Sequence, residues 1–128
     1  TIVGNVVNNS GTTGIGFYAN SSTGLTVRNT DISLNGTSSG SGTGVTGQTE
    51  GFSYVNVFGN LPEEDYEGTM NEDPKYINHD GVDPYSWDFH LKTGSGLIDA
   101  GDPEILDPDG STSDIGMYGG PMGDNWLH

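Results

Sequence analysis

A repeat of about 25 residues constrains the fold of this chain more than any other feature. Three short segments of alternating or β-branched residues, each ending in Asn, lie at residues 2–9, 25–35 and 52–60. Their closing asparagines are 26 and 25 residues apart. Short strands bounded by Gly and Asn at such a spacing are typical of stacked β repeats. One coil of this kind cannot bury its apolar stripe, whereas stacked coils bury a continuous one.

The repeat predicts parallel, in-register strands and almost no helix. We expect strands over residues 2–7, 25–34 and 52–58, with Gly14–Tyr18 and Gly44–Gly47 as second strands of their coils. Ala occurs only twice, and Gly, Asn, Ser and Thr, which favour turns over helices, are abundant. Asn also tolerates left-handed backbone, and stacked Asn side chains can form hydrogen-bonded ladders.

One stripe of β-branched side chains is predicted to line the interior of the stack. Its members are Val3, Val7, Val27, Ile32, Val55 and Val57. Asn29 and Asn56 are expected at comparable places in successive coils. Because successive side chains of a strand point to opposite faces, Asp31 is expected to face solvent.

Acidic residues dominate the second half of the chain. Of the 18 acidic residues only Asp31 lies within residues 1–49, and the net charge is −15, with Arg28, Lys75 and Lys92 as the only Lys or Arg. This balance excludes nucleic acid and anionic membrane surfaces as partners, because both require clustered cations. No apolar run is long enough to cross a bilayer, so membrane insertion is not expected. The chain lacks Cys, and disulfide or thiolate chemistry is therefore excluded.

Two parts of the sequence carry a family resemblance. The stretch GIGFYANSSTGLTVRNTDISLNG, residues 14–36, is similar to a coil of the right-handed parallel β-helix proteins of the pectate-lyase-like superfamily. The second half resembles the way in which secreted members finish their last coils, through ordered motifs at Tyr54–Asn60, Asp73–Tyr76, Asp88–Leu91, Leu97–Pro103 and Asp107–Pro121. Thr93–Gly96 departs from the family, which usually has Ser-Pro at this point.

The resemblance implies an all-β fold, a right-handed parallel β-helix (solenoid) segment with an irregular acidic C-terminal cap. Residues 1–60 would form coils, and residues 61–128 a terminal coil and the cap of the same domain. It also implies an extracellular or cell-surface location. The first coil would present an unpaired strand edge. We therefore expect either the C-terminal part of a longer solenoid or a subunit whose N-terminal edge meets other β-helix coils.

The best local motif for chemistry is an acidic turn with oxygen ligands at alternate positions. Gly110 permits a sharp turn with positive φ, and the arrangement is similar to the first half of a calcium-binding loop. Ca²⁺ requires about six to eight oxygen ligands. The predicted ligands are Asp107, Asp109, Ser111, Asp114 and Asp102, with Asp99 as a further candidate. The alternative is a Pro-Asp-Gly turn whose carboxylates cap backbone N–H groups.

Other motifs favour structural roles over catalysis. Asn29-Thr30-Asp31 resembles a motif of β-helix polygalacturonases, but the chain has neither the adjacent Asp pair nor the Gly-His-Gly of those enzymes. Asp88 and His90 share one face of a short alternating strand, which predicts a surface hydrogen-bonded pair.

The aromatic residues likewise favour structural roles, and the sequons carry no specific signal. Most aromatic residues are expected to pack in the core or the cap, with Trp87 and Trp126 partly exposed. The glycosylation sequons at Asn8, Asn20 and Asn35 are expected by chance in a chain so rich in Asn, Ser and Thr.

Two functions of different classes follow from the sequence. The first is a structural or adhesive module of an extracellular β-helix protein, which assembles through its N-terminal edge, is rigidified by calcium and can contact polysaccharide. The second is the C-terminal part of a polysaccharide lyase or glycosidase whose catalytic coils lie upstream of Thr1. The scarcity of Lys and Arg and the absence of paired acid motifs favour the first.

Overall fold

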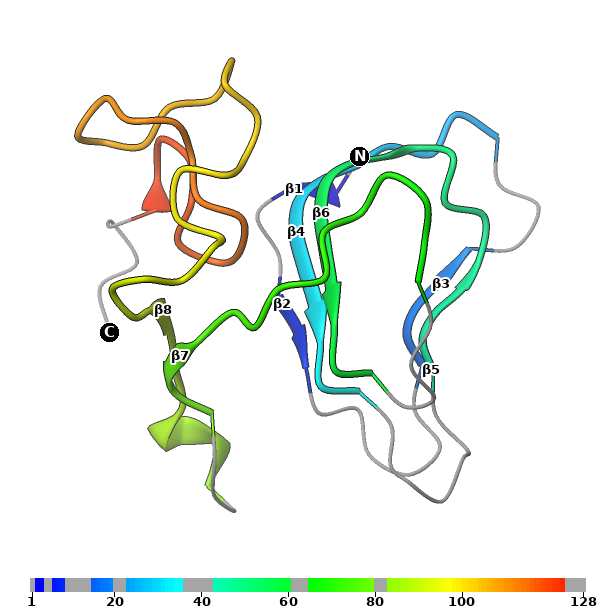
Figure 1. The fold of residues 1–128 in the computed structure, drawn as a ribbon, viewed down its shortest axis with the longest axis horizontal. Helices are drawn as coiled ribbons and strands as arrows, with labels where there is room; N and C mark the ends of the chain where they lie inside the picture. The colour runs from blue at the N-terminus through cyan, green and yellow to red at the C-terminus, as the bar shows by residue number, and fades with distance from the viewer. Residues whose placement is uncertain are drawn as a thin grey trace.

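The computed structural model describes residues 2–3, 6–8, 15–19, 23–35, 43–60, 65–79 and 83–123 (Figure 1). Within these ranges the protein is all-β, and its only helical element is the 3-10 turn η1 (Pro84–Ser86). No helix in this part of the chain is long and apolar enough to span a membrane. The strands are β1 (Ile2–Val3), β2 (Val6–Asn8), β3 (Ile15–Ala19), β4 (Val27–Ser33), β5 (Thr43–Gly47), β6 (Phe52–Phe58), β7 (Tyr76–Asn78) and β8 (Asp88–Leu91).

The predicted 25-residue repeat sets the register of the main sheet. β4 is its central strand, with β6 on one side and the two short strands β1 and β2 on the other, all parallel to it. Ile2 pairs with Val27, and Val27 pairs with Phe52, so successive strands are offset by 25 residues. The parallel in-register pairing is confirmed, with the first predicted strand divided into β1 and β2.

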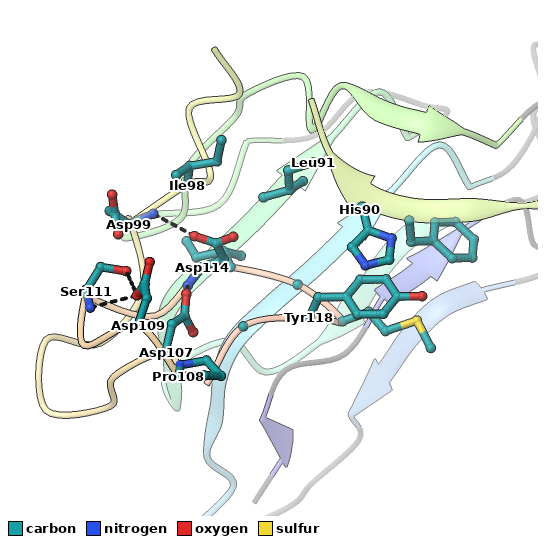
Figure 2. Close-up of a pocket in the computed structure, with 15 residues that line it drawn as sticks. His90, Leu91, Ile98, Asp99, Asp107, Pro108, Asp109, Ser111, Asp114 and Tyr118 are labelled. Atoms are coloured by element: carbon teal, nitrogen blue, oxygen red, sulfur yellow. Dashed lines mark hydrogen bonds between the residues drawn. The ribbon is translucent and has the colours of Figure 1, made fainter. Parts of the chain in front are cut away.

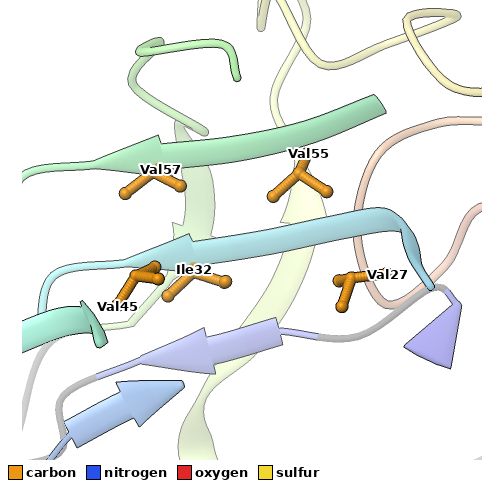
Figure 3. Packing of buried hydrophobic residues seen from close by; sticks show 5 residues of the cluster. All are labelled: Val27, Ile32, Val45, Val55 and Val57. Carbon is orange, nitrogen blue, oxygen red and sulfur yellow. The ribbon is translucent and has the colours of Figure 1, made fainter. Parts of the chain in front are cut away.

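A second parallel sheet lies across from the first and encloses the core. β3 pairs with β5, as Phe17 with Val45, which confirms the expected second strands (Figure 1). Between the two sheets lies a cluster of fully buried side chains, drawn in Figure 3: Val27, Ile32, Val45, Val55 and Val57. Four of these were predicted from the sequence, whereas the side chains of Val3 and Val7 lie outside the described residues.

Two left-handed residues change the alternation of β4 and β6. Asn29 and Tyr54 have φ values of 50° and 53°, and both lie between the register pairs Arg28–Ser53 and Thr30–Val55. The expectation that Asn29 and Asn56 occupy comparable places is wrong, because Asn56 pairs with Asp31. Left-handed backbone is uncommon for a residue such as Tyr. The sequence therefore carries no signal for this conformation at Tyr54, whereas Asn is a residue type that tolerates it.

An asparagine ladder joins the ends of β4 and β6. The Nδ2 of Asn35 donates to the Oδ1 of Asn60 at 3.0 Å, and the backbone N–H of Asn35 donates to the same oxygen. Asn60 in turn donates to the carbonyl of Ile32 at 2.8 Å. The expected ladder between repeats is confirmed at this step, whereas Asn9 lies outside the described residues.

The C-terminal segment, here the described residues 65–79 and 83–123, covers both the edge and the outer face of the main sheet. The backbone of Met70 bonds both Val55 and Val57, so that it occupies the free edge of β6. Figure 1 shows residues 71–79 and 83–123 on the side of β4 opposite β3 and β5, whereas Tyr66 lies toward β5, where its hydroxyl donates to the carbonyl of Val45 at 2.8 Å. It is irregular apart from η1 and the antiparallel pair β7–β8.

The outer face of β4 is buried, so the expectation that Asp31 faces solvent is wrong. Asp31 is 0% exposed. Neighbouring side chains of β4 bond the C-terminal segment as well: Arg28 donates to Asp102 at 2.7 Å, and Asn29 donates to Ser113 at 2.5 Å. Both faces of β4 are therefore covered, one by apolar groups and the other by polar groups. The alternation of apolar and polar residues along this strand thus marks two buried faces and not one buried and one solvent-exposed face.

Candidate functional site

The acidic turn predicted from the sequence lines a pocket of about 290 Å³ in the C-terminal segment (Figure 2). Four carboxylates lie along one side of it, and the rings of His90 and Tyr118 lie along another. The acidic lining residues are Asp99, Asp107, Asp109 and Asp114, with Ser111 beside them. The structure thus brings together four of the five predicted ligands.

The turn is shaped by its own carboxylates. Asp107 accepts hydrogen bonds from the backbone N–H groups of Asp114, at 3.1 Å, and of Gly120. Asp109 accepts from both the backbone N–H and the hydroxyl of Ser111, at 2.9 and 2.7 Å. Gly110 has a φ of 90°, as predicted. These contacts are those of the turn-capping alternative.

Asp109 and Asp114 have opposite pKa shifts although they lie in one turn. The two hydrogen bonds from Ser111 lower the pKa of Asp109. Burial raises the pKa of Asp114; the backbone N–H of Asp99 opposes this shift, and the charges of Asp107, Asp99 and Asp109 add to it. Repulsion from the neighbouring carboxylates therefore adds to the effect of burial at Asp114.

Asp102, the fifth predicted ligand, is not part of this lining. Its carboxylate accepts from the backbone N–H of Glu104 at 2.9 Å and from Arg28 at 2.7 Å, and these contacts lower its pKa. Nor does any group of three or more Asp, Glu or His side chains, within the described ranges, have the placement needed to hold a metal ion as it stands. The calcium site stays a prediction.

His90 is held in place at the edge of the pocket. Its Nδ1 lies 2.5 Å from the Oδ1 of Asp88, and its ring stacks on Tyr118 at 3.6 Å between centroids and 10° between planes. Both members of the pair are partly exposed, which confirms the predicted surface pair. Burial, and to a lesser extent the charge of Asp88, raises the pKa of Tyr118.

A second polar cluster, which the sequence reasoning missed, lies between β4 and the C-terminal segment. Asp31 accepts from Ser33 and from Asn56, each at 2.6 Å, and from the hydroxyl of Tyr76. Asn56 also bonds the backbone of Glu72, through its amide N and O at 2.9 Å each. The 25-residue spacing of Asp31 and Asn56 was the available signal, since it places the two side chains opposite each other.

The structure also places one of the two tryptophans and one of the three sequons. Trp87 is partly exposed, as predicted, while Trp126 lies outside the described residues. Asn35 is 0% exposed, and its amide forms the ladder with Asn60, so a glycan on this sequon is incompatible with the fold. The side chain of Asn8 and the whole of Asn20 lie outside the described residues.

Comparisons with protein-family models, with characterised proteins and with solved structures found no match to this chain. The resemblance to the pectate-lyase-like superfamily therefore remains a prediction. Its confirmed part is the all-β architecture with short parallel sheets and an antiparallel strand pair in the C-terminal segment.

Proposed function

We propose that the chain forms the closing end of a right-handed parallel β-helix and serves as a structural or adhesive module of an extracellular or cell-surface protein. The observation that carries this proposal is the 25-residue register of β1 and β2, β4 and β6. When adjacent parallel strands are separated by one coil of the chain, the coils form a stack. Such a stack extends by adding coils at its ends.

The two edges of the main sheet support different roles. The edge of β6 carries the backbone of Met70, so the C-terminal segment closes this end against a further strand. The outer edge of β1 and β2 has no strand against it among the residues that the structure describes. An uncovered edge is a template for strand addition. We assign this edge to contact with further β-helix coils or with a subunit.

Opening the closed edge tests this proposal. Met70→Pro removes the N–H that bonds the carbonyl of Val55 at 2.8 Å, and Pro cannot donate to a strand. We expect the variant to self-associate through β6, measured as light scattering and thioflavin fluorescence at increasing protein concentration. Met70→Leu keeps the N–H and is the matched control. If both variants remain monomeric, Met70 does not protect the edge and the closing role is lost.

The same module is proposed to bind Ca²⁺ in its acidic pocket. Four carboxylates line the pocket, and their mutual repulsion favours a cation that neutralises them. The side chains of Asp107, Asp109 and Asp114 would have to turn from backbone N–H groups toward one ion. Protons compete with the ion, because protonation of Asp114 relieves the same repulsion.

Calcium is expected to raise the melting temperature, since a ligand bound only by the folded state stabilises it by mass action. Asp109→Asn should weaken this response and Asp109→Ala nearly abolish it, because Asn keeps an oxygen while Ala removes both. Asp65→Asn removes one charge outside the pocket lining and is the control. A melting temperature that is equal in chelator and in millimolar calcium leaves only the turn-capping role.

The proposed partners are other β-helix coils and, at the cell surface, polysaccharide. The enzymatic alternative places the catalytic coils upstream of Thr1, so it is tested on a protein that includes the upstream coils. Unsaturated or reducing sugar ends released from polyuronates by that protein would overturn the structural role and favour a lyase or glycosidase.

A further inference from the structure

A fully buried carboxylate connects the main sheet to the C-terminal segment. Asp31 on β4 is 0% exposed, and Tyr76 on β7 is 1% exposed. The hydroxyl of Tyr76 donates to Oδ2 of Asp31, which also accepts from Ser33, while Asn56 of β6 donates to Oδ1. One carboxylate is thus the common acceptor of β4, β6 and β7. Separating the C-terminal segment from the sheet breaks the bond to Tyr76.

Among the residues that the structure describes, the charges around this carboxylate do not neutralise it. The charged side chain that acts on it across the interface is Asp73, which has the same sign. Arg28, on the same strand, is paired with Asp102 at 2.7 Å, and the ammonium group of Lys75 donates to the carbonyl of Gly94 at 2.7 Å. The remaining titratable group of the cluster is His79, whose ring lies 5.8 Å from the ring of Tyr76. A buried charge without an opposite partner costs free energy.

We propose that Asp31 is a proton-controlled latch: the C-terminal segment docks on β4 most tightly when Asp31 is protonated and docks less tightly as the pH rises. The proposal concerns docking within the chain and does not rest on the proposed function. It also explains why polar groups fill this interface between two parts of one small protein. Docking through apolar groups alone would not depend on pH.

The direction of the effect follows from linkage. Burial raises the pKa of Asp31 and outweighs the hydrogen bonds from Ser33, Tyr76 and Asn56. Burial and the charge of Asp31 raise the pKa of Tyr76, so this hydroxyl keeps its proton and remains a donor. When the segment opens, Asp31 returns to its ordinary pKa. Docking is therefore favoured at pH values below that ordinary pKa, and the advantage is lost as the pH rises through the pKa of the docked state.

The opening can be followed through one tryptophan. Trp87 lies beside β8, 6.0 Å from the ring of Phe89, which in turn lies 5.1 Å from the ring of Tyr76. In a Trp126→Phe background Trp87 is the only tryptophan. Urea titrations of its fluorescence between about pH 4 and pH 8 measure the docking equilibrium. We expect docking to weaken as the pH rises, by about tenfold for each unit between the docked and open pKa values of Asp31.

Three variants separate the latch from other causes. Asp31→Asn keeps the shape but does not titrate, and we expect it to remove the pH dependence assigned to Asp31. Tyr76→Phe deletes the donor, and should weaken docking at every pH while keeping the pH dependence. Asp114→Asn is the control, because Asp114 also has a raised pKa and its substitution should leave the Asp31 step in place.

The proposal can be tested even if Asp31→Asn does not fold. The NMR chemical shift of the carboxyl carbon of Asp31, measured in the unsubstituted protein, reports its protonation state directly. The latch requires that this shift titrates over the pH range in which docking weakens. A carboxyl that stays in one protonation state across that range overturns the proposal, and so does a folded Asp31→Asn protein with the original pH dependence.

Discussion

Ile32→Ala is expected to destabilise the protein by about 2–5 kcal/mol, the range for removing a large aliphatic side chain from a packed core. Ile32 is 0% exposed and lies between the two parallel sheets, in the cluster with Val45, Val55 and Val57. This core is small, so few neighbours can move into the cavity. Against a total stability of roughly 5–15 kcal/mol for a typical domain, such a loss approaches unfolding.

The matched control is Ile77→Ala. Ile77 lies on β7 and is 49% exposed, so truncating it leaves no cavity, and an effect within about 0.5 kcal/mol is expected. Chemical denaturation followed by circular dichroism measures both variants. Equal losses for Ile32 and Ile77 would mean that the cluster between the sheets is not the core.

Gly101→Ala is expected to have the second largest effect, because it separates the C-terminal segment from β4. A Cβ at Gly101 would lie 2.5 Å from both the carbonyl O and the Oγ of Ser113, and 2.9 Å from the Nδ2 of Asn29. The same groups form the bond between Asn29 and Ser113 at 2.5 Å. The added methyl group must push them apart, and overpacking of this kind costs about 1–3 kcal/mol.

Gly96→Ala is the control for this substitution. Its Cβ would meet the side chain of Glu72 at 3.5 Å, which is an ordinary van der Waals contact. Hydrogen exchange of the amides of Gly101 and Gly116, which bond Ser113 and Asn29 respectively, should rise in Gly101→Ala and not in Gly96→Ala. Unchanged protection in Gly101→Ala would show that the close approach is relieved without undocking.

The spacing of the repeats was sufficient to predict the parallel strands and most of the core. Each of the strands predicted from the repeats begins within a few residues of its expected start, and Val27, Ile32, Val55 and Val57 are buried together. Periodicity is informative here because parallel pairing at a constant offset repeats the same environment in each coil. The acidic turn was also found from its sequence, since Pro-Asp-Gly and alternating oxygen groups report local geometry.

The outer face of β4 could not be predicted in the same way. Polar residues that alternate with apolar ones normally indicate a solvent-facing side, and Asp31 and Ser33 fit that pattern. Their partner Tyr76 comes 45 residues after Asp31, and no periodic signal connects the two. The left-handed conformation of Tyr54 is likewise imposed by its neighbours, because its side chain has no preference for it.

The polar bonds of β4 also have a consequence for the order in which the protein folds. Arg28 and Asn29 bond groups that are 74 and 84 residues later in the chain, whereas successive coils pair at an offset of 25. Closing the shorter loops costs less chain entropy, and contacts between distant residues form slowly. We therefore expect the coils to assemble first and present β4 as a template, with docking of the C-terminal segment as the late, slow kinetic phase.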